Sequence, residues 1–274
     1  MRALFALPLL LVGCGPVNPG GGGGPVIGAP DCSPEPDGVI TAAESPFVPG
    51  VSATYVSSGE EAGLAFDPEP QVNVTGARTW DLTEGPDDAR ATLTLEEVAP
   101  GDWFSDSVPD AELHIASDVL RPGVHVLYAP TTEGLVAHGL ASVDPEPAAE
   151  RTLLAYDAPL LVLPLPLEVG DRWGGQATFR DARLAGVPNA GVEDWSFEVI
   201  DRAEAVLPGG TRMKDVLAVR TEVRRTLAVA ANQPGNTATT WQLQLMAPCA
   251  GELLTVSGPD EDLTVIDRMR RLLP

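Results

Sequence analysis

Hydrophobic and polar residues alternate with a period of two along much of the chain. In the clearest stretch, residues 216–229, one face carries aliphatic residues with Thr221 and Arg225 between them, and the other carries Arg220, Glu222, Arg224 and Thr226. The same alternation separates Trp195, Phe197 and Val199 from Ser196 and Glu198, and Trp241, Leu243 and Leu245 from Gln242 and Gln244. Because successive side chains of a strand point to opposite faces, this pattern predicts half-buried antiparallel strands whose apolar face packs inward.

Further short apolar runs predict additional strands. They fall at 51–56, 72–82, 91–98, 112–117, 124–128, 134–142, 151–163, 173–179, 252–256 and 263–272. The 27 prolines and 28 glycines punctuate the chain at short intervals, as expected where turns join strands. No amphipathic pattern extends beyond two helical turns. The fold class is therefore mainly β, with few or no long helices.

Residues 31–274 are expected to form a single β domain. The polar stretch 143–150 reads as a long connection inside that domain. The alternative is a pair of β subdomains, 31–143 and 151–274, joined by this stretch.

The first 30 residues have a different character. Arg2 precedes an apolar run at 3–11, which is shorter than the roughly 20 residues of a membrane-spanning helix. Leu11, Val12, Gly13 and Cys14 resemble the lipobox of bacterial lipoproteins, in which a small residue precedes the cysteine. The resemblance implies a signal peptide over 1–13, diacylglycerol on the Cys14 sulfur and an acyl chain, such as palmitate, on its amino group. Several acyl chains on one residue hold firmly, whereas a single chain anchors only marginally.

Residues 14–30 follow as a Gly- and Pro-rich linker, which is expected to be flexible because it cannot bury a core. Gly15, directly after the lipidated cysteine, favours the outer membrane over retention in the inner membrane. The sequence thus predicts a cell-envelope protein with its β domain in the periplasm or at the cell surface.

The charge of the chain limits its partners. The formal net charge is −22, and Lys214 is the only lysine. Nucleic acid is not an expected partner, because phosphate contacts need clustered Lys and Arg. Charge-driven binding to anionic lipid headgroups is disfavoured for the same reason.

Once Cys14 is assigned to the anchor, two cysteines remain. In an oxidising compartment an even pair predicts a disulfide, here Cys32–Cys249, with two buried free thiols as the alternative.

Residues 33–44 form the sharpest candidate for metal binding. Aligned with a calcium loop, Ser33, Glu35, Asp37, Thr41 and Glu44 supply oxygens, and Gly38 falls at the place of the sharp turn. Pro34 and Pro36 stiffen the loop, however. The alternative is an ordinary Asp-Gly turn with Glu44 in solvent, so Ca²⁺ is the one cofactor the sequence suggests.

Three histidines lie on consecutive predicted strands. A hairpin turning near 131–132 would place His125 directly opposite His138, where two imidazoles could hold a transition metal. The turn at Pro122-Gly123 is expected to leave His114 out of register with His125. No nucleophile motif accompanies them, so no catalytic residue is assigned and the balance leans away from an enzyme.

Several stretches in the second half of the chain resemble a group of outer-membrane lipoproteins of unassigned function from myxobacteria-like genomes. They are Tyr156-Asp-Ala-Pro-Leu160, Leu163-Pro-Leu-Pro-Leu-Glu-Val-Gly-Asp-Arg-Trp173, Glu133–Gly139 and Trp241–Gly251. The resemblance implies a strongly curved antiparallel sheet, shaped like a half-barrel lipoprotein carrier, or an open β-barrel. Cys249 stands where those proteins usually have glycine, which favours the disulfide.

Together these features predict a membrane-anchored, non-enzymatic protein that binds a hydrophobic ligand or an envelope protein in the concave face of its sheet. Two alternatives are an envelope hydrolase using carboxylates in a cleft and a calcium-stabilised adhesion or structural module.

Overall fold

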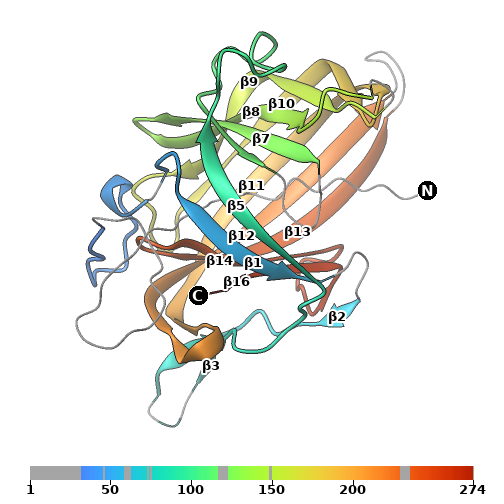
Figure 1. Cartoon of the computed structure of the whole chain (residues 1–274). Helices are drawn as coiled ribbons and strands as arrows, with labels where there is room; N and C mark the ends of the chain where they lie inside the picture. Colours follow the sequence, from blue (N-terminus) through green and yellow to red (C-terminus); the bar gives the residue numbers. More distant parts are fainter. Residues whose placement is uncertain are drawn as a thin grey trace.

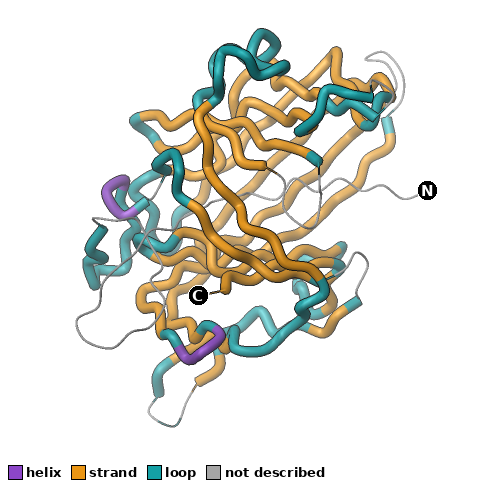
Figure 2. The backbone as a smooth tube through the Cα atoms, viewed as in Figure 1, coloured by secondary structure: helices purple, strands orange, loops and turns teal. Residues whose placement is uncertain are grey.

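The computed structural model describes residues 32–273 apart from 46, 59–62, 73, 75, 117–122, 148–149 and 229–234. Strands dominate this part of the chain (Figure 2). Its helical structure consists of two 3-10 turns, η1 (Ala42–Glu44) and η2 (Pro208–Gly210). The predicted mainly β class is confirmed.

Antiparallel strands form a closed barrel (Figure 1). Among the described residues the ring contains twelve strands, in the order β10 (Arg172–Leu184), β9 (Leu153–Pro164), β8 (Gly134–Ser142), β7 (Val124–Thr131), β6 (Leu113–Ala116), β5 (Ala89–Glu97), β1 (Ser52–Ser57), β16 (Arg268–Leu273), β14 (Gly251–Gly258), β13 (Asn236–Ala247), β12 (Arg212–Ala228) and β11 (Val187–Val206). The ring closes where β10 pairs with β11, from Arg172 opposite Glu198 to Leu184 opposite Val187. The expected β-barrel class is therefore confirmed, and the ring is closed where both the half-barrel and the open barrel of the prediction would have a gap.

Strands on both sides of residues 143–150 belong to this one ring. β8 and β9 flank that stretch and pair directly, with Ala141 opposite Leu153. In the middle of the order, β1, the first strand of the ring in sequence, pairs with β16, the last, so Tyr55 lies opposite Leu272. The first and last strands of the ring are thus neighbours.

A short extension leaves the ring beside β11. Strand β11 pairs in parallel with β4 (Arg78–Asp81), which pairs with β3 (Gln71–Val72). The single strand predicted over 72–82 is wrong, because Gly76 adopts a φ of 83° and separates two short strands. The strand predicted over 263–272 is likewise divided. Its first part, β15 (Val265–Ile266), pairs with β2 (Leu64–Ala65) in a separate two-stranded sheet.

The alternation of side chains tells which face of the ring points inward. Trp195, Phe197 and Val199 on β11 are buried and lie opposite Val223, Thr221 and Val219 on β12. The intervening positions carry exposed or half-exposed charges, including the ion pair between Arg220 and Glu198. The apolar face of these two strands therefore lines the barrel interior, as the pattern predicted.

In strand β13 the polar face, and not the apolar face, points into the barrel. Gln242 and Gln244 lie opposite Thr221 and Val219, and directly opposed residues share a face of the sheet. The glutamines therefore face the interior, and Leu243 and Leu245 face outward. Both leucines are nonetheless buried, because the outer wall is covered there. The prediction that the apolar face of this strand packs inward is wrong.

Charged side chains are also buried inside the barrel. Glu193 has no exposed surface, and its Oε1 accepts a 2.5 Å hydrogen bond from Arg225 Nε. Its Oε2 accepts from the Tyr156 hydroxyl at 2.7 Å and from Trp195 Nε1 at 3.1 Å. Burial and the neighbouring Glu193 raise the pKa of Tyr156 well above its ordinary value, so the phenol stays neutral and donates.

A second buried pair, Glu252 and Arg270, lies on β14 and β16. Arg270 Nε donates to Glu252 Oε1 at 2.9 Å, and the guanidinium lies 5.2 Å from the centre of the Tyr55 ring. Each interior charge thus has an opposite charge beside it, which offsets the cost of removing it from water.

Candidate functional site

The predicted lipobox, Leu11, Val12, Gly13 and Cys14, and the linker over 14–30 lie outside the described residues. Membrane attachment through Cys14 therefore stays a prediction. No helix in the described part of the chain is long and apolar enough to cross a membrane.

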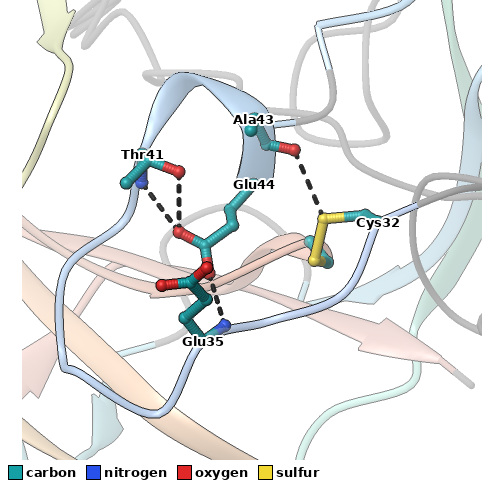
Figure 3. Close-up of a disulfide and its surroundings, with 6 residues drawn as sticks. Cys32, Glu35, Thr41, Ala43 and Glu44 are labelled. Atoms are coloured by element: carbon teal, nitrogen blue, oxygen red, sulfur yellow. Dashed lines mark hydrogen bonds between the residues drawn. A yellow bond between two sulfur atoms is a disulfide. The ribbon is translucent and has the colours of Figure 1, made fainter.

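The segment that leads into the barrel is fixed by the predicted disulfide, which is confirmed. Cys32 and Cys249 are bonded, with their Cα atoms 5.6 Å apart, and Cys249 lies in the turn between β13 and β14 (Figure 3). The backbone N–H of Cys249 also donates to the Glu44 carbonyl at 2.7 Å. A disulfide between residues 217 positions apart strongly restricts the unfolded chain. Such bonds typically add about 2–4 kcal/mol to the free energy of unfolding.

Two further bonds tie this segment to a distant connection. Ile40 and Leu167 exchange backbone hydrogen bonds of 2.9 Å in both directions, and Leu167 lies between β9 and β10. The entering segment therefore joins two connections that lie about 80 residues apart in sequence.

Within the candidate calcium loop, Glu35 and Thr41 are hydrogen-bonded to the Glu44 carboxylate (Figure 3). Glu44 Oε1 accepts from the backbone N–H of Glu35 at 2.7 Å, and Oε2 accepts from the N–H and the hydroxyl of Thr41 at 3.0 and 2.8 Å. The side chain is buried, whereas Ser33, Glu35 and Asp37 are exposed. Both carboxylate oxygens thus face hydrogen-bond donors, which is the chemistry of a cap at η1. In the described ranges, no group of three or more His, Cys, Asp or Glu residues is arranged to hold a metal ion.

The structure brings together a different pair of histidines from the one predicted. β6 pairs with β7 so that Ala116 lies opposite His125, which makes His114 its diagonal neighbour. The two Nδ1 atoms are 3.0 Å apart, and both side chains are more than nine-tenths buried. His125 lies opposite Ala141, because the hairpin turns one residue later than predicted, with Thr131 opposite Gly134, and a bulge between β7 and β8 shifts the register by one further residue. The expectation of a His125–His138 pair, with His114 out of register, is wrong.

The histidine pair lies on the outer wall, beneath the loop between β5 and β6. Phe104 from that loop packs against both rings, with centroids 5.8 Å from His114 and 5.7 Å from His125. Asp102 Oδ2 lies 3.8 Å from His114 Nε2. Burial and the neighbouring His114 lower the pKa of His125 to about 4, and burial also lowers the pKa of His138.

The outer wall is covered in two places, by the loop between β5 and β6 and by residues 63–88. The second of these places contains a cleft, which we call the outer cleft. Residues 63–88 leave the ring after β1, carry β2, β3 and β4, and return at β5. They are held against the barrel by hydrogen bonds from Leu82 N–H to the Val206 carbonyl, at 2.8 Å, and from Arg271 Nη1 to the Leu82 carbonyl, at 2.7 Å. The cleft between these residues and the wall has a volume of about 320 Å³.

The outer cleft has an apolar lining and acidic groups around it. The apolar residues are Leu64, Phe66, Trp80, Leu82, Ile266 and Met269, and the acidic residues are Asp67, Glu69, Asp81 and Glu84. Trp80 is fixed by a 3.1 Å hydrogen bond from Nε1 to the Pro68 carbonyl. Hydrogen bonds from the Thr83 hydroxyl and N–H lower the pKa of Asp81, which keeps this carboxylate ionised.

A second cleft, of about 290 Å³, lies on the wall over β10 to β13 beside Trp241. The charges that line it are paired, since Glu198 bridges Arg172 and Arg220, and Glu222 pairs with Arg224. Arg172 and Arg220 both lower the pKa of Glu198 by hydrogen bonding. Because these charges already interact with one another, they are less free to pair with a charged ligand than the carboxylates of the outer cleft.

Comparisons with protein families, with curated proteins and with solved structures found no match. The fold and the site therefore define the class on their own: a closed, mainly β barrel with a ligand-sized cleft on its outer wall. Sequence reasoning missed this cleft, because its lining comes from residues 64–86 and from 266 and 269, which the ring brings together. The local sign in the sequence was that acids lie close to large apolar residues in both 64–69 and 80–84.

A hydrogen-bonding role and a calcium-binding role for Glu44 predict different effects of Glu44→Ala on stability in Ca²⁺. Glu44→Ala leaves partly buried N–H and O–H groups without their acceptor, and we expect a loss of about 1–2 kcal/mol in the free energy of unfolding, with or without Ca²⁺. Urea denaturation in EDTA and in Ca²⁺ measures this, with Glu35→Ala, an exposed acid of the same loop, as control. A Ca²⁺-dependent gain in stability that Glu44→Ala removes would instead establish the calcium site.

The burial of His125 predicts loss of stability in acid. The pKa of His125 is lower in the folded state than the ordinary value of about 6.5, so the unfolded state binds more protons as the pH falls. The stability is complete above about pH 6.5 and declines toward pH 4, by about 2 kcal/mol between pH 7 and 4.5. Urea denaturation over this range should show a smaller decline for His125→Gln than for the wild type. Equal declines would show that His125 does not carry the effect.

Proposed function

We propose that the protein is a lipid-anchored, non-enzymatic protein of the cell envelope that binds an apolar ligand in the outer cleft. The observation that carries the proposal is the cleft itself. Its volume of about 320 Å³ falls within the range of small-molecule sites, roughly 300–1,000 Å³, and six large apolar residues line it.

The position of the cleft fits a binding role better than the barrel interior does. The interior faces of β11 and β12 carry buried apolar side chains and a paired Glu–Arg couple. The outer cleft is reached from the surface, because Asp67, Glu69 and Glu84 at its margin are exposed. The expected concave binding face is therefore replaced, in this proposal, by a site on the wall.

The remaining part of the proposal rests on the N-terminal sequence. Acylation at Cys14 would fix one end, and the Gly- and Pro-rich linker would let the barrel sample the space near the membrane. Outer-membrane localisation follows from Gly15 as a proposal of the same kind. A ligand that partitions between membrane and water would then meet the cleft close to its source.

Cys14→Ser tests the anchor. Without the thiol no diacylglycerol is attached, so we expect the protein to move from the membrane fraction to the soluble fraction and to lose incorporation of labelled palmitate. A conservative substitution in the linker, Val17→Ala, serves as control. Unchanged membrane association of the Cys14→Ser protein would contradict the lipid anchor.

Phe66→Ala tests the cleft. The full chain carrying Cys14→Ser is titrated with the neutral fluorophore N-phenyl-1-naphthylamine, and we expect saturable binding of one molecule per chain. Removing the Phe66 ring takes apolar contact area from the ligand and should weaken binding about five- to tenfold. Phe47→Ala, a partly buried phenylalanine remote from the cleft lining, is the matched control. Equal affinities for the two variants would refute binding at this site.

A further inference from the structure

The acidic groups of the outer cleft define the charge of its ligand. Asp67 and Glu69 come from the segment between β2 and β3, whereas Asp81 and Glu84 come from the end of β4 and the residues after it. Four carboxylates from two stretches of chain therefore line one cleft, and the residues described as lining it include no lysine or arginine.

The arginines on the neighbouring strands are directed elsewhere. Arg78 on β4 makes two hydrogen bonds to the Asp201 carboxylate. Arg271 on β16 is buried and donates to the Leu82 carbonyl. Neither side chain is among the residues that line the cleft, although Arg78 attracts Glu69 and Arg271 lies beside Gly85. The four carboxylates outnumber these two arginines, so the potential that an entering ligand meets is negative.

The apolar lining of the outer cleft sets a second requirement for the ligand, which must carry an apolar part. Trp80, Leu82, Ile266 and Met269 are buried in the core cluster and present apolar surface to the cleft, and Phe66 packs against that cluster. A small hydrophilic cation would leave this surface unused, and an apolar anion would be repelled by the carboxylates.

Resting on the proposed function, we propose that the ligand of the outer cleft is an amphiphilic cation, in which an apolar body packs on Phe66 and Trp80 and an ammonium or guanidinium group lies among Asp67, Glu69, Asp81 and Glu84. The carboxylates are partly exposed, so each contributes modestly and is screened by salt.

The test compares three ten-carbon probes that differ in headgroup: decyltrimethylammonium, decyl maltoside and decyl sulfate, each below its micellar concentration. Isothermal titration calorimetry is carried out on the full chain carrying Cys14→Ser. The rim variant is Glu69→Gln with Glu84→Gln. The matched control is Glu97→Gln with Glu133→Gln, which removes the same charge from two exposed positions remote from the cleft lining.

We expect the cation to bind at least about tenfold more tightly than the sulfate. The rim variant should weaken binding of the cation about three- to tenfold and leave the maltoside unchanged, whereas the control should alter neither. Raising the salt concentration should weaken binding of the cation and leave binding of the maltoside unchanged.

The outcomes separate the two proposals. If Phe66→Ala weakens all probes but the rim variant leaves the cation unaffected, or the sulfate binds as well as the cation, the charge inference is overturned and the apolar site stands. If Phe66→Ala affects no probe, the cleft is not a binding site and both proposals fail.

Discussion

The whole arrangement depends on the pairing of β10 with β11, which closes the sheet. A sheet with two free edges would expose unpaired backbone groups along both, and closure removes those edges from the ring. Strand β11 spans Val187–Val206, so it pairs with β10 along its first part and with β4 at its end. The same strand therefore closes the barrel and carries the extension that forms one side of the outer cleft.

Closure also explains how polar groups are distributed. The interior of the ring is shut off from solvent, yet it contains Glu193 with Arg225 and Glu252 with Arg270. These pairs are tolerated because each charge has a partner and further donors, such as Tyr156 and Trp195, complete the acceptor sites of Glu193. Outside, two rows of apolar residues are covered by the loop around Phe104 and by residues 63–88. The barrel thus buries apolar surface on both sides of its wall.

The two segments that cover the outer wall create its buried histidine pair and its cleft. Beneath the loop around Phe104, the wall is covered closely enough to bury two histidines, and protonation of His125 opposes folding. Beneath residues 63–88, coverage is incomplete and leaves the outer cleft. The disulfide and the bonds between Ile40 and Leu167 hold the entering segment to the barrel, so a tether attached before Cys32 would act on a fixed point.

Several features followed from the sequence by itself. Alternation over 195–199 and 216–228 fixed which residues share a face, and cysteine parity paired Cys32 with Cys249, because both arguments depend on local geometry or on counting. A period of two does not say which face is inner. That depended on what covers the other face, so Gln242 and Gln244 turned inward although the leucines next to them are apolar. Likewise the registers of β6 with β7 and of β7 with β8 decided which histidines meet, and the outer cleft arose only where residues 63–88 met β15 and β16. Such outcomes depend on contacts between residues distant in sequence, and only the closed barrel determines those contacts.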